Sequence, residues 1–274
     1  MDVARAYAAL PDRALVRVAG SDWRDFLQGL LTQDVESLAP GALRFGALLT
    51  PQGKLLFDLF ILGTDDGALI DVAAERRETL IQRLTIYRLR AKVEIAPDPR
   101  GVVAAWGGSP PSGPGWTADP RLPALGWRGY GAAAPNGVID AGEAAYQAHR
   151  LALGVPDPAR DAPSETTFPI EANFDLLGGI DFKKGCFVGQ ETTSRMKRRG
   201  AIKTRMLPLR VDGAAPAFGA EVLAGPLRAG EVRTGADGVV MALLRLDRIA
   251  GAALTVNGRP ATVDWPGYVG GVEG

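Results

Sequence analysis

The sequence predicts an α+β protein with a small closed sheet at its C-terminal end. Segments with the 3.6-residue hydrophobic spacing of amphipathic helices lie among shorter segments typical of strands. From Met206 onward, strand-like segments are separated by Gly-rich turns, which favours a barrel-like sheet. With 46% hydrophobic residues over 274 positions, the chain can bury a large core and can divide into more than one subdomain.

The first hundred residues are expected to form a sheet with two helices. Ser21 is placed to cap the first helix, with Asp22 in its first turn. The apolar face of this helix is interpreted as core and comprises Trp23, Phe26, Leu27, Leu30 and Leu31. A second helix is expected over 75–89, and the turn Pro51-Gln52-Gly53 predicts a hairpin. The expected strands are 14–19, 43–49, 54–62, 68–73, 92–95 and 102–106.

The sequence changes in composition after residue 106. The segment 107–126 is rich in Pro and Gly and has no hydrophobic period, so we expect a surface loop inside the fold. A helix is expected over 142–153, because Gly154 with Pro156 beyond it is a typical stop signal. Asn257-Gly258 strongly predicts a two-residue hairpin turn. The expected strands are 206–211, 229–234, 239–246 and 254–256.

Composition argues against several classes of function. Thirty-one Lys and Arg against 31 Asp and Glu leave no net charge, so we expect no direct nucleic-acid partner. No run of about 18 apolar residues predicts a membrane span, and the first ten residues resemble neither a signal nor a transit peptide, so a cytoplasmic location is expected. One Cys and one His are too few for an intramolecular disulfide, an iron–sulfur cluster or a structural zinc.

The single cysteine, Cys186, lies in a glycine-bounded segment that favours chemistry over packing. Gly185 and Gly189 allow a sharp turn and a close approach to a ligand. Two preceding lysines and a helix expected to begin near Gly189 would stabilise a thiolate, which is the reactive form. We therefore predict a reactive or ligand-facing thiol, and the alternative is a buried, inert cysteine at a tight strand-to-helix turn.

Around this cysteine, Lys184-Gly185-Cys186-Phe187-Val188-Gly189-Gln190-Glu191 resembles the signature of the YgfZ family of folate-binding proteins. The resemblance covers nearly the whole chain and extends to the segments 26–35, 48–54, 87–90, 150–154 and 168–171. It implies a relative of the glycine-cleavage T-protein that binds tetrahydrofolate or another reduced folate. It further implies a role in the assembly or repair of iron–sulfur enzymes, including those that modify tRNA, with client enzymes or cluster carriers as partners.

The same resemblance implies a domain arrangement. Residues 1–200 would form a T-protein-like folate-binding body of two interleaved α+β lobes, with the Pro/Gly-rich loop 107–126 inside it. Residues 201–274 would form a C-terminal β-barrel-like domain. The predicted architecture is therefore three-lobed, with Cys186 at the mouth of the folate site.

A folate site needs a carboxylate for the paired donors of the pterin ring and bases for the anionic tail. The candidate acids are Glu171 and Glu191, with Asp34 a weaker one, and the candidate bases are Arg150, Lys184 and Arg195. Glu191 and Arg150 each have another interpretation, because both lie near helix ends where they complement the macrodipole. The predicted cofactor-binding residues are Lys184, Gly185, Gly189, Gln190, Glu191, Arg195, Arg150 and Glu171, with Cys186 as the catalytic residue and no metal ligands.

Three alternative functions stay open. An aminomethyl or methyl transferase is disfavoured, because the T-protein relatives carry an Asn and then an Asp near the stretch 72–79, where neither occurs here. A non-catalytic adaptor for a cluster carrier needs no thiol chemistry. A cysteine hydrolase would pair Cys186 with His149, although His149 falls inside an amphipathic helix where a structural role is more common.

Overall fold

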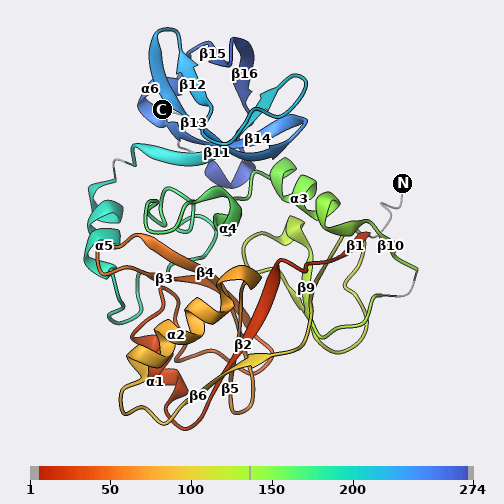
Figure 1. The fold of residues 1–274 in the computed structure, drawn as a ribbon, viewed down its shortest axis with the longest axis vertical. Helices are drawn as coiled ribbons and strands as arrows, with labels where there is room; N and C mark the ends of the chain where they lie inside the picture. Colours follow the sequence, from red (N-terminus) through yellow and green to blue (C-terminus); the bar gives the residue numbers. More distant parts are fainter. Residues whose placement is uncertain (1–5, 136, 201, 271–274) are drawn as a thin grey trace.

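The computed structural model describes residues 6–135, 137–200 and 202–270, without the side chain of residue 199. These residues form two five-stranded sheets and a closed barrel. In Figure 1 the barrel lies at the top, one sheet lies beneath it around β3 and β4, and the other lies to the right around β1 and β9. This arrangement confirms the predicted three-lobed α+β architecture with a C-terminal barrel.

The first sheet has the order β3-β4-β5-β2-β6 and is antiparallel throughout. Its core side packs against helices α1 and α2, whose Leu27, Leu80 and Leu84 are fully buried. These residues recur at helical spacing, which is why the sequence pattern located both helices. The element bounds are β2 Arg13–Ala19, α1 Trp23–Gln28, β3 Leu43–Leu49, β4 Leu55–Gly63, β5 Gly67–Ala73, a 3₁₀ turn Ala74–Arg76, α2 Arg77–Arg88 and β6 Glu94–Asp98.

The second sheet has the order β10-β1-β7-β9-β8, and helix α3 packs against β1. Tyr146 of α3 is buried against Val102 and Ala104 of this sheet. The short helix α4 and the helix α5 lie in the long connection between α3 and the barrel (Figure 1). The bounds are β1 Ala6–Ala9, β7 Val102–Trp106, β8 Trp116–Ala118, a 3₁₀ turn Pro123–Leu125, β9 Trp127–Tyr130, β10 Ile139–Asp140, α3 Gly142–Ala152, α4 Pro158–Asp161 and α5 Gln190–Arg199.

The barrel closes in the order β11-β14-β13-β12-β15-β16, which confirms the closed sheet expected from the Gly-rich turns. Leu207, Val240 and Ala242 are among the residues that fill it. Asn257 and Gly258 both have positive φ, at 51° and 75°, as a tight hairpin turn of the primed type requires. The bounds are β11 Thr204–Val211, β12 Glu221–Ala224, β13 Leu227–Ala236, β14 Gly238–Arg245, α6 Leu246–Ile249, β15 Leu254–Val256, β16 Arg259–Val263 and a 3₁₀ turn Gly267–Val269.

Three local expectations were wrong or incomplete. Asp22, not Ser21, is the N-cap residue of α1, and its carboxylate accepts the backbone N–H of Lys92 instead of capping the helix. The segment 107–126 is not a plain surface loop, because it contains β8 and a 3₁₀ turn and contributes buried side chains. Six strands were not predicted, because each has five residues or fewer and is too short to show a clear alternation: β1, β8, β9, β10, β12 and β16.

A buried ion network joins the two sheets. Asp71 of β5 is fully buried and accepts hydrogen bonds from Arg13 Nε of β2 and Arg128 Nη2 of β9, both at 2.6 Å. The Tyr130 hydroxyl donates to the same carboxylate at 3.2 Å. Arg13 also reaches Asp58 Oδ2 at 2.8 Å. One carboxylate therefore holds cations from both sheets, and its loss would leave two buried guanidinium groups undercompensated.

Asp71→Asn is expected to lower the free energy of unfolding by about 3 to 5 kcal/mol at neutral pH, because a broken buried ion pair leaves uncompensated charge. Burial opposes ionisation of Asp71, but Arg128 and Arg13 outweigh it and hold its pKa below the ordinary 3.8. The difference between parent and variant is therefore constant above about pH 4. It shrinks as the pH falls through the lowered pKa, where Asp71 itself becomes neutral.

Urea denaturation of both proteins at pH 7, 5 and 3 measures this difference. Asp66→Asn is a matched control, since Asp66 is an exposed partner of Arg17, and its loss should cost less than about 1 kcal/mol. Equal stability of parent and Asp71→Asn at pH 7 would contradict the central role of the network.

Candidate functional site

Cys186 lies exposed on the irregular segment that leads into α5. Gly189, the residue before α5, has φ of 79° and sits against the β3–β4 turn. A Cβ atom placed on Gly189 would come within 2.6 Å of Thr50 O and 2.9 Å of Gly53 Cα. Glycine is therefore required here both for the backbone conformation and for the close approach. The alternative of a buried, inert cysteine is wrong, because the thiol faces solvent.

Lys184 anchors the other end of the cysteine segment. Its Nζ donates to the backbone carbonyls of Gln28 and Leu31, at 2.6 Å each, just beyond helix α1. Burial lowers the pKa of Lys184 to about 8. The Asp181 carboxylate accepts the backbone N–H groups of Lys183 and Lys184. Three segments that are distant in sequence therefore meet around the cysteine: 26–35, 48–54 and 184–191.

The remaining predicted residues of this region have distinct positions. Gln190 is the first residue of α5, and Glu191 and Arg195 are exposed on that helix. Gly185 is exposed beside the thiol, with open space around its Cα. Glu171 lies elsewhere, where its carboxylate accepts the Phe168 N–H at 2.8 Å and the Thr204 hydroxyl at 2.7 Å. Glu171 therefore links the body to the first barrel strand.

The carboxylate of Asp34 already has several hydrogen-bond donors within the chain. Its carboxylate accepts hydrogen bonds from Arg44 at 2.8 Å and Gln28 at 3.1 Å, and from the Ser37 hydroxyl. Burial opposes ionisation of Asp34, but these hydrogen bonds outweigh it and hold its pKa well below the usual range. Asp34 fixes the loop that follows α1 and has little capacity left for a ligand.

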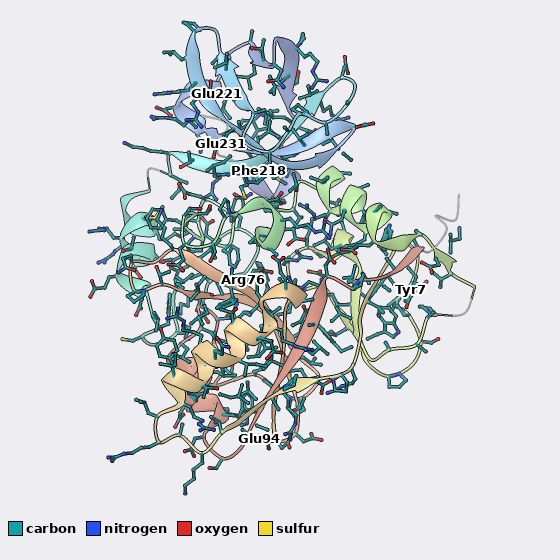
Figure 2. All side chains as sticks on the ribbon, viewed as in Figure 1. Tyr7, Arg76, Glu94, Phe218, Glu221 and Glu231 are labelled. Atoms are coloured by element: carbon teal, nitrogen blue, oxygen red, sulfur yellow. The ribbon has the colours of Figure 1, made fainter. Side chains whose placement is uncertain are left out.

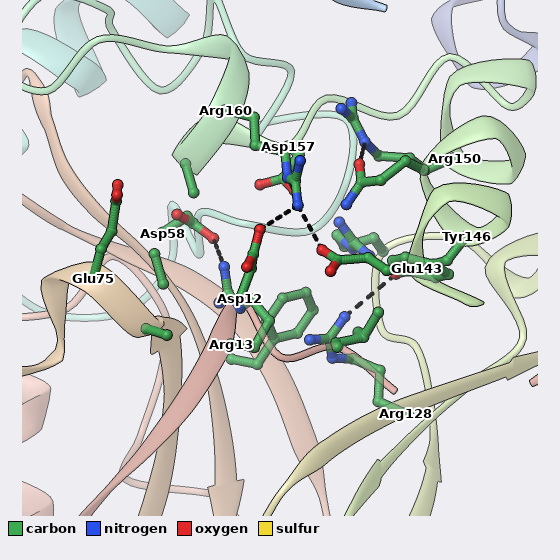
Figure 3. A pocket seen from close by; sticks show the side chains of 17 residues that line it. Asp12, Arg13, Asp58, Glu75, Arg128, Glu143, Tyr146, Arg150, Asp157 and Arg160 are labelled. Atoms are coloured by element: carbon green, nitrogen blue, oxygen red, sulfur yellow. Dashed lines mark hydrogen bonds and ion pairs between the residues drawn. The ribbon is translucent and has the colours of Figure 1, made fainter. Parts of the chain in front are cut away.

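A separate cavity of about 220 Å³ lies where the two sheets meet α3 and α4 (Figure 3). Of the predicted cofactor-binding residues, Arg150 lines it and the other seven do not. The Arg150 guanidinium is already engaged, with Asp161 at 2.7 Å, Gln147 at 2.5 Å and Thr234 at 3.2 Å. Arg150 consequently builds the cavity wall and ties α3 to α4 and the barrel.

Asp157 is an acid of this cavity whose carboxylate is held only by a long ion pair among the described residues. Its carboxylate accepts no hydrogen bond from the described residues, and the nearest cation, Arg160 Nε, lies 3.6 Å away. Burial opposes ionisation of Asp157, but the charges of Arg150, Arg13 and other lining arginines hold its pKa below the usual range. Asp157 is therefore an ionised acceptor facing the cavity, as Figure 3 shows.

Arg160 and Glu75 complete the rim of the cavity. Arg160 forms ion pairs with Asp12, before β2, and Glu143, on α3, and so closes one side. Glu75 also lines the cavity. It lies just after β5, in the stretch 72–79 where the T-protein relatives carry an Asp that this chain lacks. An adjoining groove of about 580 Å³ shares Glu75 and Arg160 with the cavity and is also lined by Arg76 and Phe218.

Asp157, Arg160 and Glu75 were not predicted from the sequence. Asp157 and Arg160 flank the helix signal Pro158 and resemble ordinary residues of a helix start. Only the packing of α4 against the sheets turns them toward one space. No local pattern signals this role.

The cysteine and the cavity are separate. Cys186 lines neither the cavity nor the groove. The expectation that the thiol lies at the mouth of a folate site stays a prediction. Figure 1 shows α5 and α3 on opposite sides of the body. His149 of α3 stacks on Trp106 with ring centroids 5.4 Å apart, and its Nε2 donates to the Ala124 carbonyl. Burial lowers the pKa of His149, and a hydrolase pair with Cys186 is not assembled.

Two features are absent from residues 6–135, 137–200 and 202–270. No group of three or more His, Cys, Asp and Glu side chains in these ranges is arranged to hold a metal ion. None of the helices within them is both long and apolar enough to cross a membrane.

The chain is similar to known proteins in sequence and in fold. Residues 203–270 match the model of the CAF17 C-terminal β-barrel domain. The mitochondrial iron–sulfur cluster assembly factor IBA57 of Homo sapiens is 32% identical over 277 residues, covering 88% of this chain and 78% of that protein. The IBA57 homologue of Neurospora crassa is 33% identical over 253 residues, covering 80% of this chain.

Fungal relatives are longer than this chain, which spans 57% of the Neurospora crassa protein and 56% of the Mycosarcoma maydis protein. Among solved structures, the glycine cleavage aminomethyltransferase T of Bartonella henselae superposes with a TM-score of 0.78 at 17% identity. That match covers 97% of this chain and 87% of the other, and it confirms the T-protein-like fold.

These matches correct two expectations from the sequence. The relatives are named as mitochondrial proteins, which contradicts the expected cytoplasmic location. The YgfZ resemblance identified a related family instead of the matching one. On these sequence matches, the chain belongs to the IBA57 family of iron–sulfur cluster assembly factors, with the CAF17-type barrel at its C-terminal end.

Proposed function

We propose that this protein acts in iron–sulfur cluster assembly and that Cys186 supplies a thiolate to a cluster carried by a partner protein. The observation that carries the proposal is the exposure of the single cysteine on a segment pinned at both ends. The family membership supports the same role. Because the chain has one cysteine, the other cluster ligands belong to the partner.

In this proposal the protein only has to position the Cys186 thiolate and let it bind iron. Lys184 and Gly189 hold the segment against α1 and the β3–β4 turn, which restricts the positions that the Cys186 Sγ can adopt. The thiol gives up its proton to solvent and its sulfur binds a cluster iron, as thiolates do in iron–sulfur proteins. A cluster bridged between two chains is then shielded by both surfaces.

Cys186→Ser is expected to restore less than about one tenth of the parent's iron–sulfur enzyme activity in a strain that lacks the gene. Serine keeps the size of the side chain but loses the soft thiolate that iron prefers in clusters. The measurement is the activity of cluster-dependent enzymes, normalised to a dehydrogenase that has no cluster.

The control for folding is the thermal midpoint, which should match the parent, because Cys186 is exposed and its side chain fills no core. Full complementation by Cys186→Ser would remove the thiol from the mechanism. The adaptor hypothesis would then stand in its place.

We further propose that the cavity between the sheets binds tetrahydrofolate or another reduced folate. The Asp157 carboxylate is ionised, faces the cavity and has no donor of its own, so it can accept the paired N–H groups of a pterin. The adjoining groove offers Arg76, which has no salt bridge among the described residues, to the anionic tail. The cavity alone is smaller than typical sites for drug-sized ligands, which fits a pterin inside and a tail along the groove.

When bound, a reduced folate supplies one-carbon or reducing equivalents. The residues of this chain orient it: Asp157 fixes the ring, and Arg160 is itself held by Asp12 and Glu143. Because Cys186 lies apart from this cavity, folate and thiol serve different steps.

Asp157→Asn is expected to weaken tetrahydrofolate binding about 10- to 100-fold, because a neutral amide cannot accept two charge-assisted hydrogen bonds. Calorimetric titration of the parent, Asp157→Asn and Glu191→Gln measures this. Glu191→Gln should bind like the parent, since Glu191 lies on α5 outside the cavity.

The reverse result, weak binding by Glu191→Gln and parent-like binding by Asp157→Asn, would place the folate at the cysteine motif. No binding by the parent would remove folate from the proposed function and leave the role of Cys186 standing.

A further inference from the structure

Helix α5, which follows the cysteine segment, has two unlike faces. Its inner face carries Thr193, which is fully buried, and Met196, which packs on the core around Phe187. Its outer side carries Arg195 and Arg198, which are exposed and three residues apart and so are neighbours on the helix surface. Lys197 is exposed on the other side of the helix, where its Nζ lies 5.3 Å from the centroid of the Phe182 ring. We call Arg195 and Arg198 the basic face of α5.

The cations of the basic face are not neutralised. Within the described ranges, neither arginine forms a salt bridge with a carboxylate, although Arg198 Nε donates to the Ser194 carbonyl at 3.4 Å. On the barrel, by comparison, Arg210 pairs with Asp264 and Arg245 with Asp247. The basic face therefore presents positive charge that no carboxylate of the described residues compensates.

Stabilisation of the helix does not account for the whole basic face. Cations near a helix C-terminus complement the macrodipole, which explains Arg198. Arg195 lies in the middle of the ten-residue helix, where that effect is small. Glu191 lies four residues before Arg195 on the same helix, but the two side chains form no salt bridge among the described residues.

The position of the basic face relates it to Cys186. The thiol lies three residues before Gly189, the N-cap of α5, and a ten-residue helix is about 15 Å long. A protein that brings a cluster to Cys186 must therefore cover part of α5. The chain as a whole has no net charge, so the attraction that this face offers is local.

We propose that the basic face of α5 docks an acidic surface of the protein that carries the cluster to Cys186. The inference rests on the proposed function, in which a partner supplies the remaining cluster ligands. Charge complementarity selects the occupant: two exposed arginines with no carboxylate partner among the described residues, on the helix that follows the thiol, fit a surface rich in Asp and Glu. A cluster bound by thiolates is itself anionic and adds to the attraction. The face sets the approach and orientation of the partner, and Cys186 makes the bond.

A chemical probe tests the local field without knowledge of the partner. Peptides Glu-Glu-Glu-Glu-Cys and Lys-Lys-Lys-Lys-Cys, each with its thiol activated as a mixed disulfide with thionitrobenzoate, are allowed to react with the protein. The Cys186 thiolate attacks the peptide sulfur, a new disulfide forms, and thionitrobenzoate leaves and is measured by absorbance. The acidic peptide should react about tenfold faster than the basic one at 10 mM salt, and the difference should nearly vanish at 300 mM.

Charge reversal assigns the effect to α5. In Arg195→Glu/Arg198→Glu the preference for the acidic peptide should be lost or reversed. The matched control is Arg88→Glu/Arg90→Glu, which makes the same change in net charge at exposed positions near the end of α2 and should leave the preference intact. Equal rates for both peptides with the parent protein, or equal shifts in both double variants, would overturn the proposal.

The same variants are tested in the deletion strain. Arg195→Glu/Arg198→Glu should reduce iron–sulfur enzyme activity about fivefold or more, Arg195→Gln/Arg198→Gln should have a smaller effect, and Arg88→Glu/Arg90→Glu should match the parent. Parent-like activity of the α5 reversal together with failure of Cys186→Ser would sink the docking surface alone. Parent-like activity of Cys186→Ser would overturn the proposed function itself.

Discussion

The structure depends on the buried carboxylate of Asp71. It receives Arg13 from its own sheet, in a part-buried bond, and Arg128 from the neighbouring one, in a buried bond. A buried carboxylate between two arginines is costly to expose or to unpair, so it fixes how the two sheets meet. Arg13 and Arg128 also line the cavity beside Asp71, so the same ion pairs fix the position of part of the cavity wall.

The same body positions two chemically different regions. On one side, the cysteine segment is held by the hydrogen bonds of Lys184 to the end of α1 and by the close packing of Gly189 on the β3–β4 turn. On another side, α3 and α4 close a charged cavity over the edges of the sheets. The T-protein-like fold thus provides an internal ligand space and an external thiol at different places. In the proposed function, this separation would keep the folate and the protein partner from competing for one surface.

Hydrophobic period located most of the helices and strands, because long amphipathic segments reveal which face is buried. The prediction failed where tertiary contacts outweigh local preference. The segment 107–126 reads as a loop, yet Asp119 and Arg121 within it form a buried ion pair at 2.7 Å. Ser21 suits a helix cap by type, but Asp22 occupies that position. Polar residues at such points are satisfied by distant partners that no local window contains.

The sequence by itself determined that Cys186 is the one available thiol, that it is bounded by glycines, and that it precedes a helix with a basic end. These properties depend on residues adjacent in the chain. The tertiary structure decided what the candidate folate residues do: Lys184 anchors, Arg150 and Glu171 join lobes, and Asp157 faces the cavity instead. The reason is physical, since a charged side chain takes its role from the charges that folding brings within a few ångströms of it, and residues far apart in the sequence supply those charges.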